Sequence, residues 1–332
     1  MPIQIEDRFI GCMEGLAIGD ALGFPVEFMN LREIKQIFGP EGVTGFDSIE
    51  KCLGRKFPYP VGSYSDDTQM TLATARGLLK SRSTDLEDIM PPIVHEYIEW
   101  QDSPENDRAP GTTCTAGIEN LKRGIHWTKS GIPGGKGCGA AMRTAPIGLY
   151  FLQDLEKLIS VAYHAGGCTH GDQGAIEAGI AAAIAVNLVA NSEVHPLKPM
   201  EIYERTIGYL TNKALIQKLR QVEQVLPMSN HEEALNLLGE GWIGIEAITL
   251  AFYCFLKNPT DYTKTVLMGA NTNGDSDSIA CIAGAISGAY NGAQAIPVGW
   301  LERLENRSLL RQTAIDLNRA RQNSQSLEKG LS

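Results

Sequence analysis

The sequence predicts an all-α protein, a compact many-helix orthogonal bundle in a single domain. Apolar residues recur at three- and four-residue steps along most of the chain, most clearly at 176–188, where every fourth residue is isoleucine or leucine. No series of alternating apolar and polar residues predicts a sheet. Glycine and alanine are concentrated at 10–22, 174–186 and 279–289, and helices of this composition can approach one another closely in a core.

The predicted helices follow one another with short connections. In order, they lie at 7–22, 68–79, 86–100, 154–165, 172–188, 200–211, 213–225, 231–238, 245–256, 260–269, 278–290 and 299–320. The helix at 86–100 follows Ser-Thr-Asp, residue types that favour a helix start. The segments 39–65, 101–115 and 128–142 are predicted to be irregular, and loops of that length in a compact domain are more often functional than idle.

Length and charge bound the possible functions. The 332 residues contain no linker and no repeat of fixed period, so we expect one domain over 1–332, with a polar tail after about residue 321 that frays. The net charge of −10 argues against broad nucleic-acid binding through a basic face. It also means that an anionic ligand would need metal ions or backbone N–H groups to hold it.

The cysteines and the apolar runs indicate a cellular compartment. Seven scattered cysteines with no C-x-x-C pair predict reduced thiols in a cytoplasmic protein, without a disulfide framework or a zinc site. The N-terminus has no basic segment followed by an apolar one, so no signal peptide is predicted. The longest apolar run, 178–190, contains Asn187 and is shorter than the ~20 residues that a membrane span needs, so no membrane partner is expected.

Two acidic segments far apart in the chain share the same residue types. Segment 64–68 (YSDDT) and segment 271–278 (NTNGDSDS) each carry two aspartates among hydroxyl groups, and no lysine or arginine occurs within 61–75 or 266–290. Helix capping is the simpler explanation of either segment alone, since Ser65 is a good N-cap and acids favour a first helical turn. Two such segments without a counter-charge indicate instead that a hard metal ion holds the carboxylates.

Three further segments are candidate walls of a site. The loop 19–27 carries Asp20, which is typical of a helix end, and Glu27, which stands in an otherwise apolar stretch. The glycine-rich loop 131–143 allows close backbone approach and can cradle an anion through its N–H groups, although a flexible turn has the same pattern. His170 precedes a predicted helix; a lone histidine is usually a packing or surface residue.

Six ordered motifs resemble those of the ADP-ribosylglycohydrolase family, which includes ADP-ribosylarginine hydrolases and dinitrogenase reductase-activating glycohydrolases. The resemblance runs from Arg8 to about Arg307. The motifs are GDALG (19–23) with Glu27, SDDTQM (65–70), RAPGTTC (108–114), GCGAAMR (137–143), Thr169-His170 and NGDSDS (273–278). Six motifs in the right order are far more specific than any one of them.

The resemblance implies an all-α protein with a dinuclear metal cleft that holds two divalent cations, Mg²⁺ or Mn²⁺. The family's metal ligands fall on Ser65, Asp66, Asp67, Asp275, Asp277 and Ser278. Oxygen ligands of this kind suit a hard cation better than zinc. The candidate catalytic bases are Asp66, Asp67 and Glu27. The residues predicted to contact the substrate are Gly111, Gly137, Cys138, Gly139, His170, Asn273 and Gly274.

These assignments predict a metal-dependent hydrolase that cleaves the N-glycosidic bond of ADP-ribosylated arginine in proteins and releases ADP-ribose. Serine at both ends of the ligand set and the GCGAAMR motif resemble the arginine-directed branch. One departure is Ala109, where some dinitrogenase reductase-activating members have an aspartate that meets the opened ribose.

Two alternatives stay open. One is a hydrolase of another linkage, such as ADP-ribosylserine, O-acetyl-ADP-ribose or a phosphoester. The other is a non-catalytic, crystallin-like scaffold, against which the four intact aspartates argue.

Overall fold

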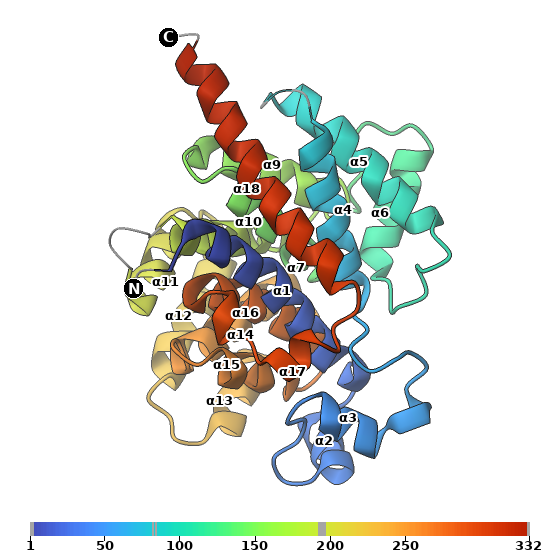
Figure 1. Ribbon diagram of the computed structural model, residues 1–332, viewed down its shortest axis with the longest axis vertical. Helices are drawn as coiled ribbons and strands as arrows, with labels where there is room; N and C mark the ends of the chain where they lie inside the picture. The colour runs from blue at the N-terminus through green and yellow to red at the C-terminus, as the bar shows by residue number, and fades with distance from the viewer. Residues whose placement is uncertain (1–2, 82, 84, 192–196, 331–332) are drawn as a thin grey trace.

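Two helices rich in glycine and alanine lie antiparallel at the centre of the fold. The computed structural model describes residues 3–81, 83, 85–191 and 197–330, and in it α1 (Ile5–Gly23) packs along α16 (Ser276–Asn291) (Figure 1). A β-carbon on Gly11 would lie 2.3 Å from the carbonyl oxygen of Gly288, and one on Gly19 would lie 2.1 Å from that of Ala280. The two backbones can approach this closely only because these positions carry no side chain.

The remaining helices surround this central pair. Helices α10, α14 and α15 pack against α16, while α18 crosses α1 from the other side (Figure 1). The bounds are α4 (Asp66–Lys80), α5 (Leu86–Asp102), α6 (Thr112–Lys122), α7 (Gly139–Met142), α8 (Ala145–Tyr150), α9 (Leu155–Gly167), α10 (Gln173–Ala190), α11 (Pro199–Gly208), α12 (Lys213–Val225), α13 (His231–Leu238), α14 (Gly244–Lys257), α15 (Tyr262–Ala270), α17 (Val298–Leu301) and α18 (Arg307–Gly330).

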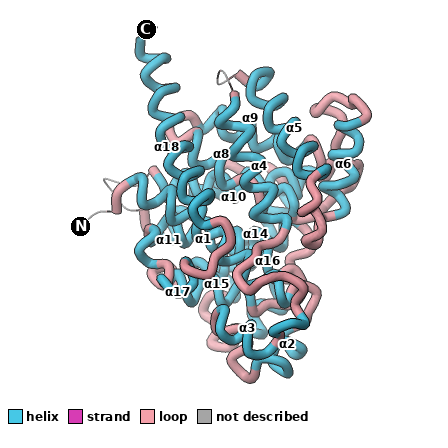
Figure 2. Tube along the Cα trace, turned by 45° about the vertical axis from the view of Figure 1, so that its right-hand side comes forward, coloured by secondary structure: helices cyan, strands magenta, loops and turns pink. Residues whose placement is uncertain are grey.

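Two short helices lie together at one end of the molecule, apart from the main bundle. They are α2 (Leu31–Phe38) and α3 (Phe46–Cys52), and Figure 2 shows them at the same end after a turn of 45°. The segment that enters this end carries Glu27, just after the 3₁₀ turn Phe24–Val26. The position of this pair therefore bears on the candidate site.

The prediction of an all-α fold is confirmed. Within the described ranges there is no β-strand, and the β-type pairings are two isolated bridges, Ile132 with His170 and Gly137 with Ile243. The buried apolar side chains form one connected cluster, as expected of a single compact domain.

Helices α1 and α10 are apolar and long enough, by composition alone, to cross a membrane. In this fold their most apolar windows are 100% and 94% buried, respectively. Both are therefore core helices, and their composition reflects burial by protein on all sides.

The structure contains short helices that the sequence analysis did not predict. Helices α3 and α6 occupy segments predicted to be wholly or partly irregular, and α2 was not anticipated. The seven and eight residues of α3 and α2 give too few turns for periodicity to reveal a helix. For α2 a signal was present, because Asn30 and Glu33 form a capping box in which each side chain accepts the other's backbone N–H.

The predicted single helix at 299–320 is wrong. It is divided into α17 and α18, and the turn between them contains Asn306, which has a φ of 48°. A residue in the left-handed region cannot continue a right-handed helix. The expected fraying after about residue 321 stays a prediction.

The line of close contact between α1 and α16, here called the seam, predicts that the effect of a Gly→Ala substitution on stability depends strongly on its position. Gly19→Ala would place a methyl group against the backbone of Ala280, so we expect the free energy of unfolding to fall by about 1–3 kcal/mol or more in urea titrations. Gly208→Ala, at an exposed helix position with no atom within 4 Å of the added carbon, should leave stability unchanged or slightly higher. Equal effects of the two substitutions would contradict the close packing.

Candidate active site

The two acidic segments lie side by side at one pocket. Asp66 and Asp67 open α4, and Asp275 and Asp277 stand at the start of α16. Carboxylate oxygens of Glu27, Asp275 and Asp277 lie within 4.8 Å of one another. The pocket encloses about 250 Å³ and is lined by Glu27, Phe28, Asp66, Asp67, Ala109, Pro110, Gly111, Thr112, Thr113, Cys114, Gly137, Cys138, Gly139, Met142, His170, Trp242, Asp275, Asp277 and Ser278.

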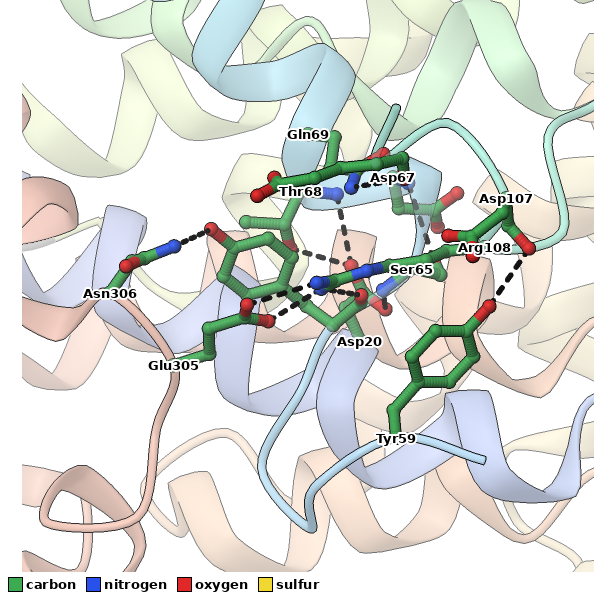
Figure 3. A network of polar contacts seen from close by, with 12 residues as sticks. Asp20, Tyr59, Ser65, Asp67, Thr68, Gln69, Asp107, Arg108, Glu305 and Asn306 are labelled. Carbon is green, nitrogen blue, oxygen red and sulfur yellow. Dashed lines mark hydrogen bonds and ion pairs between the residues drawn. The ribbon is translucent and has the colours of Figure 1, made fainter. Parts of the chain in front are cut away.

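Asp20, near the end of α1, fixes the start of α4. Its Oδ1 accepts the N–H of Ser65 at 2.8 Å, and its Oδ2 accepts both the N–H and the hydroxyl of Thr68, at 2.9 and 2.6 Å (Figure 3). The Ser65 hydroxyl in turn caps α4 by accepting the N–H of Asp67 at 3.3 Å. These bonds set the backbone from which Asp66 and Asp67 reach the pocket. The sequence analysis had interpreted Asp20 only as a typical helix-end residue.

The loop before α6 holds Asp66 from the other side. The carbonyl oxygen of Arg108 accepts the N–H of Asp66 at 3.1 Å, and the N–H of Gly111 donates to Asp66 Oδ2 at 3.2 Å. Arg108 is itself held in place, because its guanidinium donates to both carboxylate oxygens of Glu305 (Figure 3). It also donates to the carbonyl of Tyr64. Between these anchors Ala109 adopts a φ of 56°, an uncommon conformation for a residue with a side chain.

The second acidic segment is positioned by a thiol and a hydroxyl. The Cys138 thiol donates to Asp275 Oδ2 at 2.8 Å and lies 3.3 Å from the Ser278 hydroxyl. Asp277 Oδ1 accepts the N–H of Ser278 at 3.0 Å. Asp275 is the N-cap residue of α16 by position, but its side chain makes no capping bond. The capping alternative therefore does not account for the Asp275 carboxylate.

Burial and mutual repulsion raise the pKa of the clustered carboxyl groups. Burial is the larger cause, followed by the charge of Asp277, and the pKa rises to about 11 for Glu27 and about 7 for Asp20. The same causes raise the pKa well above the ordinary value for Asp66, Asp67 and Asp275. No ion pair in the described part of the chain includes any of these groups. Their negative charge is therefore not offset by lysine or arginine.

The donor atoms of this cluster fit a divalent cation. Glu27 Oε2 and Asp67 Oδ2 are buried and make no hydrogen bond, so each has lone pairs free for a ligand. The remaining donors are carboxylate and hydroxyl oxygens, which Mg²⁺ and Mn²⁺ prefer. Glu27 belongs among the possible ligands by position, whereas the sequence analysis had given it only a catalytic role.

The structure brings most of the predicted site residues together. The pocket is lined by eleven of them: Asp66, Asp67, Glu27, Asp275, Asp277, Ser278, Gly111, Gly137, Cys138, Gly139 and His170. Ser65 lies directly behind the pocket, where its hydroxyl accepts the N–H of Asp67. Asn273 and Gly274 are not in the lining. Asn273 Oδ1 accepts the N–H of Leu31 at 2.7 Å, so its side chain anchors the start of α2, and Gly274 has a φ of 82° in the turn that leads to α16. The substrate contacts of these two residues stay a prediction.

Two aromatic residues in the pocket lining were missed by sequence reasoning. Phe28 and Trp242 stack with ring centroids 5.3 Å apart and an interplanar angle of 21°, and Phe28 remains 68% exposed. Phe28 has a φ of 70°, a conformation in which a bulky residue is an outlier. More than two hundred residues separate the two rings in the chain, so no local pattern could have linked them.

Comparisons with known proteins give matches over nearly the whole chain. The model of the ADP-ribosylglycohydrolase family matches residues 1–327. A protein of Archaeoglobus fulgidus is 32% identical over 94% of this chain and 96% of its own length. The ADP-ribosyl-[dinitrogen reductase] glycohydrolase of Rhodospirillum rubrum is 31% identical over 91% of this chain and 92% of its own.

More distant relatives are similar over nearly the same length. The Homo sapiens ADP-ribosylhydrolase ARH3 is 27% identical over 90% of this chain and 89% of its own. A solved structure described as an ADP-ribosylglycohydrolase-related protein complex superimposes with a TM-score of 0.70 at 26% identity, covering 96% of this chain and 99% of the other.

The carboxylate cluster predicts how stability depends on pH and metal. These pKa values are higher in the folded protein than in the unfolded chain. In EDTA, which removes metal ions, the free energy of unfolding should therefore fall as pH rises above ~4. The contribution of Asp20 to this fall should continue to about pH 7. In EDTA at pH 8, Asp275→Asn should therefore unfold at a higher temperature than the wild type, because it removes one of the repelling charges.

Addition of Mg²⁺ should reverse that order. We expect saturating metal to stabilise the wild type by about 2–4 kcal/mol, whereas Asp275→Asn should gain much less. The control is Glu41→Gln, an exposed charge outside the pocket, which should follow the wild type in both conditions. Thermal unfolding curves that are identical with and without Mg²⁺ would contradict the metal site.

Proposed function

The chain belongs to the ADP-ribosylglycohydrolase family, and we propose that it hydrolyses the N-glycosidic bond of ADP-ribosylated arginine in proteins and releases ADP-ribose. The observation that carries this proposal is the cluster of buried carboxylates at the pocket. Two of their oxygens are unpaired, and no lysine or arginine occurs among the described residues that line the pocket. A non-catalytic scaffold has no need of so costly an arrangement.

The proposed metal ligands are Ser65, Asp66, Asp67, Asp275, Asp277 and Ser278, with Glu27 as a further candidate. Two divalent cations, Mg²⁺ or Mn²⁺, would supply Lewis acidity and offset the carboxylate charge. The chain's own contribution is to hold these oxygens in place, through Asp20 on one side of α4 and the Arg108–Gly111 loop on the other.

Hydrolysis joins a water oxygen to the anomeric carbon of the distal ribose and breaks the bond from that carbon to the guanidine nitrogen. The water must lose a proton, and the leaving guanidine must gain one. The unpaired oxygens of Glu27 and Asp67 are the best placed to accept the water proton, because nothing in the described chain occupies them. This role requires the bound cations, whose charge would lower the raised pKa of both carboxyl groups. The backbone N–H groups at Gly137–Gly139 are the proposed contacts for the anionic part of the substrate. Gly111 lines the same pocket, but its N–H already donates to Asp66.

Charge and shape favour arginine as the leaving group. A guanidinium is cationic, so it is attracted to a pocket lined by acids, whereas a serine hydroxyl is neutral. The exposed face of Phe28, next to Glu27, offers a guanidinium a surface of the kind that attracts cations. The relative from Rhodospirillum rubrum, whose name includes dinitrogen reductase, supports the same branch.

A second candidate is the hydrolysis of another ADP-ribose linkage, such as ADP-ribosylserine or O-acetyl-ADP-ribose. Ala109 supports this second candidate, because some arginine-directed relatives have an aspartate at this position of the pocket lining and this chain does not. For the protein's surroundings we propose the cytoplasm, which suits its seven free cysteines, and ADP-ribosylated proteins as its substrates.

A comparison of substrates tests the linkage. We expect the release of ADP-ribose from an ADP-ribosylarginine peptide at least about tenfold faster than from the matched ADP-ribosylserine peptide, because only the first leaving group is attracted to the acidic pocket. EDTA should abolish the activity, and Mg²⁺ or Mn²⁺ should restore it. Faster release from the serine peptide would favour the second candidate. If neither peptide releases ADP-ribose, both proposed activities are wrong.

Substitutions separate metal binding from proton transfer. Asp66→Asn and Asp275→Asn should each lower kcat by more than about a hundredfold and weaken Mg²⁺ binding in calorimetry. Glu27→Gln keeps the size of the side chain, so we expect slower turnover with Mg²⁺ still bound. If it loses the metal as well, Glu27 acts mainly as a ligand; full activity would remove it from the mechanism. Circular dichroism should show the helical fold intact in all three variants.

A further inference from the structure

A fully buried arginine lies behind the pocket without a carboxylate partner. Arg143 is 0% exposed, and none of the ion pairs in the described chain includes it. Its guanidinium lies 4.7 Å from the ring centroid of Tyr97 and donates to the Ala165 carbonyl at 2.8 Å, to Cys114 Sγ at 3.2 Å and to Thr169 Oγ1 at 2.6 Å. Burying a cation among neutral groups alone lowers the stability of the fold, so we expect the Arg143 charge to serve a function.

The Thr169 hydroxyl lies between Arg143 and His170 and is hydrogen-bonded to both. Thr169 Oγ1 accepts from Arg143, so its own proton is free for one acceptor. The two acceptors within reach are the Gly166 carbonyl at 3.2 Å and His170 Nδ1 at 2.8 Å. The Gly166 carbonyl already receives the backbone N–H groups of Thr169 and His170, at 3.2 and 3.0 Å. The hydroxyl proton is therefore best placed on His170 Nδ1.

Electrostatics favours the same assignment. If Nδ1 carried the proton, its N–H dipole would point toward the side of the ring on which the Arg143 charge lies, which is repulsive. With a lone pair at Nδ1, the ring proton sits on Nε2. Burial and the Arg143 charge also lower the pKa of His170 to about 3, so the ring stays neutral at physiological pH.

His170 Nε2 is buried, has no hydrogen-bond partner and belongs to a residue of the pocket lining. Gly137 and Gly139 lie against this nitrogen, and a β-carbon on either would come within 3.4 Å of it. Because both neighbours are glycines, no side chain from either stands between the ring edge and the pocket that His170 lines. An N–H at this position is therefore a donor that lacks its acceptor.

We propose that Arg143 and Thr169 are positioning residues that fix His170 as a neutral Nε2–H donor for an anionic oxygen of the substrate, such as a phosphate oxygen of a nucleoside diphosphate. The assignment of that oxygen to ADP-ribose rests on the function proposed above, but the relay itself does not. The pocket would then offer both the carboxylate cluster and this donor, which is backed by the Arg143 charge.

The first test observes the histidine ring directly, in the free protein. With ¹⁵N-labelled histidine, and the His170 signals identified by their loss in His170→Phe, we expect the wild-type ring to carry its proton on Nε2 between pH 5 and 8. Thr169→Val keeps the shape and removes the hydroxyl, so a measurable Nδ1–H fraction should appear, and Thr169→Ser should restore the wild-type form. Thr206→Val, which removes a buried hydroxyl bonded within its own helix, is the matched control and should change nothing.

The second test measures binding of ADP-ribose in the presence of Mg²⁺ by calorimetry. His170→Phe should bind at least about tenfold more weakly, because a donor to a charged acceptor is lost. His170→Gln retains an amide N–H and should recover part of that loss.

The two tests fail independently. A proton on Nδ1 in the wild type, or an unchanged ring in Thr169→Val, overturns the relay. If His170→Phe binds ADP-ribose as tightly as the wild type, the donor role is wrong. If the wild type binds no ADP-ribose, the proposed function fails, whereas the spectra still decide the relay.

Discussion

The accumulation of negative charge in a buried place is the constraint on which this structure depends. Asp66, Asp67, Asp275 and Asp277 are buried and face one pocket with the half-buried Glu27. Like charges this close raise one another's pKa and push their segments apart. The fold must therefore supply a rigid frame, and the cations proposed for this site would supply the compensating charge.

The frame is the antiparallel pair of α1 and α16. Asp20 stands near the end of α1 and holds the start of α4, while α16 begins at the second acidic segment. Because the glycines of the seam bring the two backbones into contact, the ends that carry the acids have a fixed separation. The Arg108–Glu305 clamp adds a second support, through the loop that bonds Asp66. Chemistry at the pocket is thus set by packing that extends over the whole length of a helix.

The sequence predicted the features that have a local signature. The helical period identified the long helices, and the paired aspartates without neighbouring cations identified the acidic segments. It could not predict contacts made only by folding. Asp20 looks like any helix-end residue until Ser65 and Thr68 are seen to donate to it, and the Phe28–Trp242 stack joins residues that have no common motif. Asn273 belongs to the acidic segment in sequence, but its side chain serves the start of α2.

The contact between α1 and α16 ends at the acidic pocket itself. A β-carbon on Gly23, the last residue of α1, would lie 2.5 Å from the backbone of Asp277. A substitution there would wedge apart the helix ends that present the acids, so folding and turnover would deteriorate together. Natural selection cannot then lose the close helix packing while keeping activity. Laboratory evolution toward new substrates would instead vary the exposed edge of the pocket around Phe28 and Trp242, where side chains can change without moving α1 and α16.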